Sequence, residues 1–405
     1  MRATYGKSIV AMTPMIVASI LLTIVNIRLQ QVWKGEAAFG AAVNHIGEQR
    51  FKPAEAELAT ALRFNPDNAH YYAHQGLLRE RSLQQRIEPF MQGRPEFDET
   101  QQAQLRAAVQ SYQKVLELNR GDDSAYHNLG WLYWFLRQDQ DALACFQKAV
   151  ELDQAAPLYH LSLGIQRELS NDQSAATAEF AAALRLSPGL LNSRFYSDLS
   201  AASPQRAKEI VATTIRQLEN QMQAGFDPVV AGKLGRFYLE LQPGRAFELL
   251  NRVTQTLPSL SRPWANLGYY YELHGNESLM EECYRKALFL DSSDALSWYR
   301  LGKYYDRRNR LPDAARCYDR AVNLFIRSQS IHSDRVRRIY FSRFTMPDDV
   351  VPNGLSLYTA QSIEFPETCR RLSEIYEAMG DKAAMQRIAE LVKKYSLEND
   401  PSKSH

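Results

Sequence analysis

The sequence predicts an all-α fold, a solenoid of antiparallel helix pairs, and three observations predict it. Residues 123–156 and 157–190 are adjacent segments of equal length with the same order of apolar and small residues. Repeats of about 20–50 residues are typical of solenoids, in which each unit buries its apolar face against the next. Pro188 stands near the end of the second segment, where a residue without an N–H stops a helix.

The two segments agree position by position. Both carry Leu-Gly at the seventh and eighth positions, Ala at the twentieth, Phe at the twenty-fourth and Ala at the twenty-seventh. These residues are Leu129, Gly130, Ala142, Phe146 and Ala149 in the first segment and Leu163, Gly164, Ala176, Phe180 and Ala183 in the second. Small residues let the two helices of a pair approach closely and large ones fill the space between pairs, so these side chains are expected in the core.

This pattern resembles the tetratricopeptide repeat, and the resemblance covers most of the chain after residue 34. Similar marks recur in units that begin at residues 35, 69, 228, 261 and 295. The resemblance implies a right-handed superhelix whose concave face is lined by the first helix of each pair. It also implies that this face binds proteins or peptides.

The places where the pattern holds and where it breaks divide the chain. We expect a short flank at 1–7, a transmembrane helix at 8–27, a first repeat array at 35–190 with an insertion at about 80–100, a degenerate helix pair at 191–227, a second array at 228–328, an irregular loop or hairpin at 329–365, a capping helix pair at 366–395 and a disordered tail at 396–405. Turn signals at Pro347-Asp348 and Asn353-Gly354 mark the irregular segment.

Residues 8–27 carry no charged side chain and lie between Lys7 and Arg28. At about 1.5 Å per residue such a helix spans roughly 30 Å, the thickness of the hydrocarbon layer of a bilayer. A cleaved signal peptide and a buried core helix are the alternatives, and the first would have a shorter apolar region with a small-residue cleavage site. We expect an uncleaved single-pass anchor in the lipid bilayer, of the kind that bacterial repeat proteins carry.

The charges around this segment predict its orientation. Arg2, Lys7 and the amino terminus precede it, whereas Arg28 and Lys34 follow it. Because positive charge favours the cytoplasmic side, the N-terminus is expected in the cytoplasm and the solenoid outside it, in the periplasm.

The composition argues against several classes of function. Lys and Arg number 48 against 46 Asp and Glu, and a net charge of +2 argues against nucleic acid as a partner. The four cysteines form no C-x-x-C pair and are expected as free thiols. No metal-binding or nucleophile motif occurs, so we expect no enzyme, no catalytic residue, no cofactor, no metal and no small-molecule substrate.

The first candidate site is an apolar groove. In the tetratricopeptide family, bound segments contact the second, fifth, sixth and ninth residues of the first helices. In residues 123–190 these positions and the neighbouring rim are apolar and aromatic, and the candidates are His127, Asn128, Trp131, Trp134, Leu158, Leu161 and Ile165. Such a surface suits an apolar helix or strand of a partner. The alternative is that neighbouring turns or the inserted segment cover it.

The second candidate site is a basic groove. In residues 228–328 the same positions give Lys233, Arg236, Arg262, Asn266, Tyr269, Arg300 and Lys303. Asn266 and Arg300 resemble part of the carboxylate clamp with which some tetratricopeptide domains hold acidic C-termini, but Gly232 and Leu296 stand where that clamp has lysines. The hypothesis is therefore a looser groove for acidic peptides, and the alternative is a solvated helix face.

Two hypotheses for function follow. The first is a membrane-anchored protein–protein interaction scaffold, an assembly factor or subunit of a membrane complex, with other membrane or envelope proteins as partners. The second is an accessory factor in the synthesis or export of envelope polysaccharide or lipopolysaccharide. One family in that second group carries a C-terminal C-x-x-C metal module, which this chain lacks.

Overall fold

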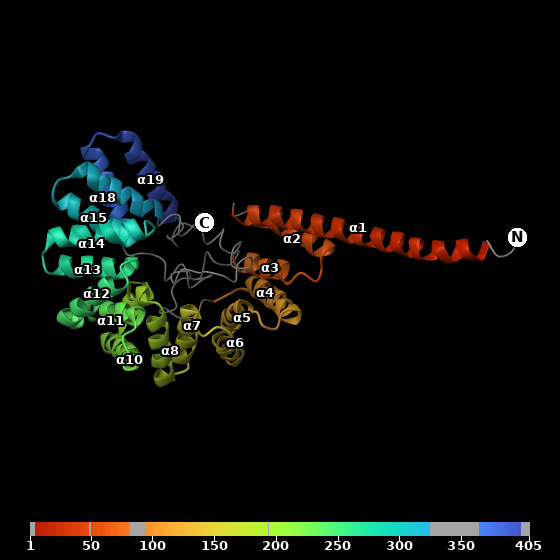
Figure 1. Cartoon of the computed structure of the whole chain (residues 1–405), viewed down its shortest axis with the longest axis horizontal. Coiled ribbons are helices and arrows are strands. Elements are labelled where there is room, and N and C mark those ends of the chain that lie inside the picture. The colour runs from red at the N-terminus through yellow and green to blue at the C-terminus, as the bar shows by residue number, and fades with distance from the viewer. Residues whose placement is uncertain are drawn as a thin grey trace. The chain divides into compact units, whose positions relative to one another are not determined.

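The chain folds into successive helix hairpins (Figure 1). The computed structural model describes residues 5–47, 50–81, 94, 96–192, 194–324 and 364–397, and every regular element among them is helical. The all-α prediction is confirmed for these residues. They form two compact units, and the boundary between them falls between α5 and α6, inside the repeat expected at 123–156.

The first unit contains five helices among the described residues: α1 (Tyr5–Gly47), α2 (Phe51–Phe64), α3 (Ala69–Arg81), α4 (Glu99–Leu118) and α5 (Asp123–Phe135). Each packs against the next along the chain. The C-terminal part of α1 is the first helix of the repeat expected from residue 35, and its Ala38, Phe39 and Ala42 are buried in one cluster with Leu58 of α2 and Tyr71 of α3.

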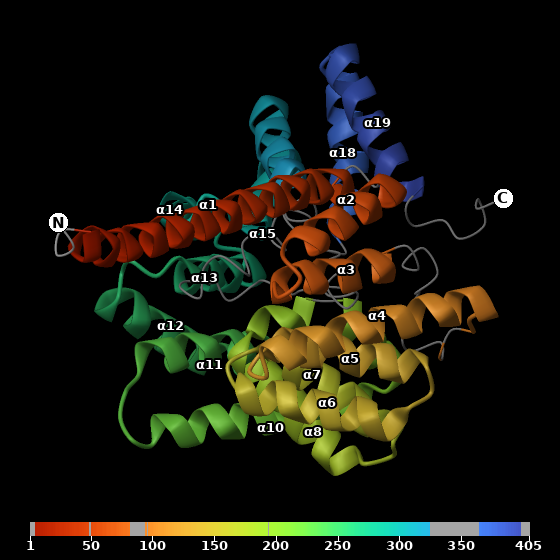
Figure 2. The same cartoon turned by 90° about the vertical axis from the view of Figure 1, so that its right-hand side faces the viewer.

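Helix α1 is one element where the sequence predicted two. It begins at Tyr5 and continues to Gly47, so the apolar segment and the first repeat helix are a single helix. Figure 2 shows α2 beside the C-terminal part of α1, with the remainder of α1 extending beyond it.

The transmembrane prediction for residues 8–27 is wrong by this structure. Within the residues that it describes, no helix is long and apolar enough to cross a membrane. The uncharged run belongs to the single helix α1, which continues past Arg28 and Lys34 to Gly47. The single-pass localisation, with a cytoplasmic N-terminus and a periplasmic solenoid, is withdrawn with it.

The second unit continues the helix pairs. Its described elements are α6 (Asp139–Leu152), α7 (Pro157–Leu169), α8 (Gln173–Leu186), the 3-10 helix η3 (Pro188–Asn192), α9 (Arg194–Ala202), α10 (Pro204–Met222), α11 (Pro228–Leu241), α12 (Pro243–Thr256), α13 (Ser261–Leu273), α14 (Glu277–Leu290), α15 (Ala295–Arg307), a helix over 311–324, α18 (Glu364–Ala378) and α19 (Lys382–Leu397). The segment expected to be a degenerate pair corresponds to η3, the short α9 and the long α10.

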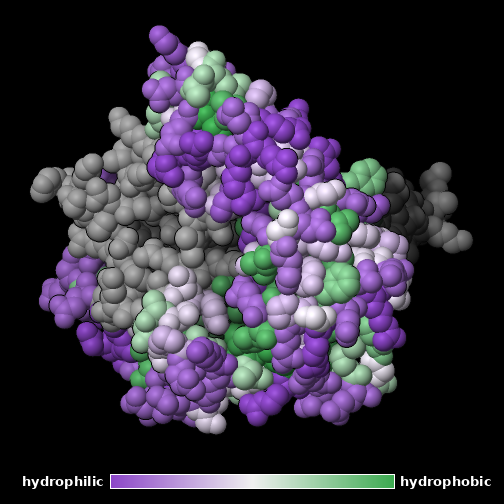
Figure 3. Space-filling view, turned by 90° about the vertical axis from the view of Figure 1, so that its left-hand side faces the viewer, coloured by the Kyte–Doolittle hydropathy of each residue, from purple (hydrophilic) through white to green (hydrophobic). Residues whose placement is uncertain are grey.

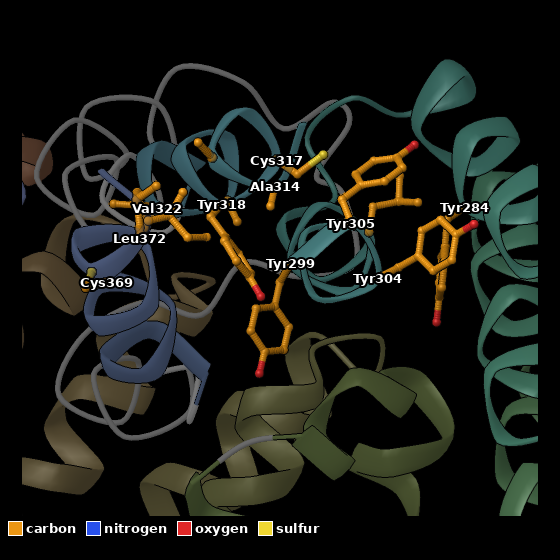
Figure 4. Close-up of a cluster of buried hydrophobic side chains, with 14 of the residues drawn as sticks. Tyr284, Tyr299, Tyr304, Tyr305, Ala314, Cys317, Tyr318, Val322, Cys369 and Leu372 are labelled. Carbon is orange, nitrogen blue, oxygen red and sulfur yellow. The ribbon is translucent and has the colours of Figure 1, made fainter. Parts of the chain in front are cut away.

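The small residue at the eighth position of each repeat faces a large one on the second helix. A Cβ added to Gly268 would lie 2.8 Å from the Tyr284 ring, and one added to Gly302 would lie 2.6 Å from the Tyr318 ring. Figure 4 shows Tyr284 and Tyr318 in the buried cluster that joins these pairs. Only glycine leaves room for the rings, so this spacing fixes how closely the two helices of a pair approach.

The helix pair at 364–397 stacks on α15 in the register of a further repeat. Arg371 of α18 donates to Asp306 through Nε at 2.6 Å and through Nη2 at 2.7 Å. Tyr299 donates to Glu367 at 3.0 Å, and Cys369 and Leu372 are buried in the same core as Tyr318. The array therefore continues after residues 325–363, which lie outside the described residues together with 82–93 and 398–405. Most of the insertion, irregular-segment and tail predictions fall there.

Candidate binding face of the first helices

Helices α11, α13 and α15 are first helices of successive repeats, and α11 and α15 begin alike with an aspartate cap, whereas α13 begins after Leu260 without a side-chain cap. Asp227 caps α11 by accepting from Val229 N at 2.7 Å, and Asp294 caps α15 by accepting from Leu296 N at 3.1 Å. Such caps satisfy amide groups that have no partner within the helix and fix where it starts. The sixth, ninth and twelfth residues of each repeat then lie on one side of its first helix, because they are about one turn apart.

Tyr269 lies at the centre of this face. The guanidinium carbon of Arg300 lies 4.1 Å from the centroid of its ring, and that of Arg236 lies 5.8 Å away. A guanidinium at this distance is attracted by the negative face of the ring. The Tyr269 hydroxyl donates to Glu240 Oε1 at 3.2 Å. One aromatic ring from α13 thus holds two arginines, one from α11 and one from α15.

A second carboxylate completes the arrangement. Glu272 Oε2 accepts from Arg300 Nη1 at 2.9 Å and from the hydroxyl of Tyr284 at 2.9 Å. The side chains of Arg300 and Glu272 are 21% and 17% exposed, so their ion pair is only partly screened by water. Burial alone lowers the pKa of Arg300, but Tyr284 and Glu272 outweigh it and the pKa lies above its usual value. We call Arg236, Glu240, Tyr269, Glu272 and Arg300 the Tyr269 cluster.

The Tyr269 cluster is electrically balanced. It contains two guanidinium groups, Arg236 and Arg300, and two carboxylates, Glu240 and Glu272. Burial lowers the pKa of Arg236, and the nearby Glu240 opposes that shift. The sequence argument counted the cations at the sixth and ninth positions and missed the carboxylates one turn further along each helix. The acidic residues Glu272 and Asp306, both at the twelfth position, were the signal that could have revealed the pairing.

The other residues of the predicted basic groove lie in different environments, and none of them belongs to the Tyr269 cluster. Lys233 Nζ donates to the carbonyl of Leu186, the last residue of α8, at 3.2 Å. A lysine there satisfies a helix-terminal carbonyl and complements the negative end of the helix dipole. Lys303 Nζ lies 5.5 Å from the centroid of the Tyr299 ring, Asn266 is half-buried, and Arg262 is exposed. The structure therefore brings together Arg236, Tyr269 and Arg300 and places Lys233 elsewhere.

The residues of the predicted apolar groove belong to two different units. In the first unit, His127 and Trp134 on α5 are 1% and 2% exposed, and Asn128 is also buried. Trp131, which is half-buried, donates through Nε1 to His127 Nε2 at 3.2 Å. Burial lowers the pKa of His127 to about 3, so the ring is neutral at pH 7.

In the second unit, the remaining apolar candidates lie on α7. Leu158, Leu161 and Ile165 are all buried. Every residue from Leu158 to Gln166 is buried, so both the inner and the outer side of this helix are covered. An apolar groove at α5 and α7 therefore requires a rearrangement that uncovers these side chains.

Elsewhere on the described surface, polar side chains predominate. Figure 3 shows one face of the molecule on which hydrophilic side chains predominate and hydrophobic ones form small groups. Phe289 of α14 is 82% exposed, next to Lys286. In the described part of the chain, no group of three or more His, Cys, Asp and Glu side chains could hold a metal ion. Among the predicted site residues, those of the Tyr269 cluster form a partly exposed group of polar and aromatic side chains on the first helices.

Comparison with known proteins agrees with the repeat pattern. The tetratricopeptide repeat family matches residues 123–155 and 261–294. No curated protein matches the chain in sequence.

Three solved structures illustrate the structural likeness. YrrB, described as a tetratricopeptide protein with an unusual peptide-binding site, is 16% identical, with 59% of this chain and 95% of YrrB covered and a TM-score of 0.26. PilF of Pseudomonas aeruginosa is 13% identical, with 66% and 96% covered and a TM-score of 0.32. A tetratricopeptide repeat protein from Parabacteroides merdae is 13% identical, with 65% and 96% covered and a TM-score of 0.32. Likeness at this level assigns no partner to the present chain.

Proposed function

We propose that this chain, which carries tetratricopeptide repeats at 123–155 and 261–294, is a protein–protein interaction scaffold that binds a partner segment on α11, α13 and α15. The tetratricopeptide fold itself suggests protein binding. The finer part of the proposal is the place, the face around the Tyr269 cluster, with Tyr269 as its central contact.

The observation that supports this place is the partial exposure of Tyr269 between Arg236 and Arg300. Tyrosine and arginine are the residue types that contribute most to binding at protein interfaces, where a rigid ring offers contact area at a small entropic cost. The ring of Tyr269 is already held by its neighbours, so a partner that packs against it has little side-chain freedom to remove.

The proposal names no pathway. A role in assembling a membrane complex, and the accessory role in envelope polysaccharide or lipopolysaccharide synthesis or export, both relied on the membrane segment, and no observation on the described residues favours either of them. The proposal involves no catalytic step.

Site-specific photo-crosslinking in cells that express the full chain tests the proposal. A photoreactive phenylalanine at position 269 is expected to capture a partner protein that Tyr269→Ala protein no longer retains in a pull-down. The same probe at Phe289, which is exposed on α14, is the matched control and is expected to capture nothing specific. Equal capture at both positions, or retention of the partner by Tyr269→Ala protein, would show that the binding face lies elsewhere.

A further inference from the structure

The charges of the Tyr269 cluster carry information about its partner. Arg300 is the guanidinium nearest the ring, and Glu272 already occupies it at 2.9 Å. The same oxygen of Glu272 accepts from the buried Tyr284 hydroxyl at 2.9 Å. Glu272 therefore stands where the carboxylate of an acidic ligand would have to bind, and it does so with a second hydrogen bond that such a ligand could not replace.

An acidic segment would have to displace Glu272 from Arg300. Displacement would leave a carboxylate that is 17% exposed without its charged partner, next to an incoming negative charge. Losing a hydrogen bond to a charged group and leaving its partner buried is unfavourable, and the repulsion between two carboxylates adds to that cost. Glu240, which accepts from the Tyr269 hydroxyl, repels an acidic side chain that approaches that hydroxyl.

The outer residues of this face disfavour the binding of a basic segment. Arg262 is exposed on α13, and Lys303 is half-buried on α15. Arg236 and Arg300 lie 5.8 Å and 4.1 Å from the centroid of the Tyr269 ring. A strongly basic segment would meet these four cations before it reached the two carboxylates of the cluster, and like charges placed opposite each other weaken binding.

We propose that Glu240 and Glu272 are specificity-determining residues that exclude acidic segments, so that the face takes an uncharged segment of a partner protein. This inference rests on the proposed binding function of the same face. It replaces the hypothesis of a groove for acidic peptides, because Arg236 and Arg300, the two arginines nearest Tyr269, lie beside carboxylates of the protein itself.

Direct binding measurements with the full chain test the inference. The probe is a fluorescein-labelled peptide of ten residues that alternates Glu and Ser, measured by fluorescence polarisation at low salt. Glu272→Gln keeps an acceptor of the same shape and removes the negative charge that competes with the probe for Arg300. We expect Glu272→Gln protein to bind the probe at least about tenfold more tightly than the wild type, the order of one charge-assisted hydrogen bond. The gain is expected to disappear in the Glu272→Gln, Arg300→Gln double variant.

A matched control separates this effect from a change in net charge. Glu281 of α14 pairs with Arg285 at 2.9 Å and accepts from Tyr305 at 2.7 Å, so it makes the same kinds of contact on a second helix. Glu281→Gln changes the net charge equally and is expected to leave binding of the probe unchanged. Thermal unfolding of each variant confirms that it is folded.

The outcomes distinguish this inference from the function on which it rests. Equal binding of the acidic probe by wild type and Glu272→Gln protein, or an equal gain in Glu281→Gln protein, would overturn the role of Glu272. If the segment crosslinked at position 269 is acidic, the inference is wrong and the binding function stands. If position 269 captures no partner while Glu272→Gln gains the acidic probe, the charge argument stands and the binding function is wrong.

Discussion

Helices α7 and α13 hold the same position in their repeats, yet only α13 presents an open face. Both are first helices of 13 residues with Leu-Gly at the seventh and eighth positions. In α7 nine consecutive residues are buried, whereas in α13 only Pro263, Leu267 and Gly268 are. At the second, fifth, sixth and ninth positions α7 carries Leu158, Leu161, Ser162 and Ile165, and α13 carries Arg262, Ala265, Asn266 and Tyr269.

This difference shows that the repeat pattern determines which residues of a first helix face the second helix. The residues on the opposite side vary from one repeat to another. The positions that face the second helix are equivalent in α7 and α13, since Gly164 approaches Phe180 as Gly268 approaches Tyr284. The opposite positions are apolar where the helix is covered and polar where it is open. Most side chains of α13 are at least partly exposed, and for this reason the proposed function is placed there.

The largest expected effect concerns the outer side of α7. Leu161 is 2% exposed, so Leu161→Ala removes buried methyl groups and leaves a cavity. Unfolding by urea is expected to show a loss of about 2–5 kcal/mol in the free energy of unfolding. Asn266→Ala, at the sixth position of the open α13, is the control and is expected to change it by less than about 0.5 kcal/mol. Similar values for the two variants would remove the distinction between a covered and an open first helix.

The next effect depends on pH. His127 occupies on α5 the position that Leu161 occupies on α7, and burial lowers its pKa to about 3. In the unfolded chain its pKa is about 6.5, so between these values the unfolded state binds more protons and stability falls as pH falls. At pH 5 the loss is about 2 kcal/mol from this group, since each pKa unit corresponds to about 1.4 kcal/mol.

Replacing His127 tests that contribution. Glutamine can accept the hydrogen bond from Trp131 Nε1 but does not titrate in this range. Urea midpoints measured from pH 7 to pH 5 are expected to fall less in His127→Gln protein than in the wild type. The reverse result, an equal fall in both proteins, would mean that other groups account for the loss of stability in acid.

The helix-pairing glycines should respond alike in both helices. Gly164→Ala brings a Cβ within 2.6 Å of the Phe180 ring, and Gly268→Ala brings one within 2.8 Å of the Tyr284 ring. Overpacking of this kind costs about 1–3 kcal/mol, and we expect the two variants to differ little in thermal unfolding. Gly232→Ala, whose Cβ would meet Pro263 at an ordinary 3.6 Å, is the control. A much smaller effect at Gly268 would show that α13 can move away from α14.

The sequence predicted the side of each first helix that packs against the second helix of its own pair, because the repeat period fixes those residues. A Leu-Gly pair followed by an aromatic residue sixteen positions after the glycine predicts the contact of Gly268 with Tyr284, because both lie within one repeat. The outer sides depend on residues far away in the chain. The burial of α7 does not follow from a pattern within one repeat, and the pairing of Glu272 with Arg300, 28 positions apart, is visible only when the twelfth position of one repeat is compared with the sixth of the next.

The smallest effect concerns how far the open array extends. Arg371 and Asp306 form a bidentate pair between α18 and α15, equivalent in position to Arg300 and Glu272 between α15 and α13. Because Arg371 is 40% exposed, solvent screens the pair, and Asp306→Asn is expected to lower the free energy of unfolding by only about 1 kcal/mol. Hydrogen exchange is the more sensitive measurement, since weakened stacking exposes the amides of a terminal repeat first.

Asp306→Asn is therefore expected to accelerate exchange in α18 and α19 and to leave α11 and α13 unchanged. Asp313→Asn is the matched control, because Asp313 pairs with Arg310 within its own helix region and not with α18. If exchange in α18 is the same in both variants, the pair does not hold the last repeat in place. If exchange in α18 rises only in Asp306→Asn protein, the Arg371–Asp306 pair holds α18 against α15. The pair then joins the repeat before residues 325–363 to the repeat after them.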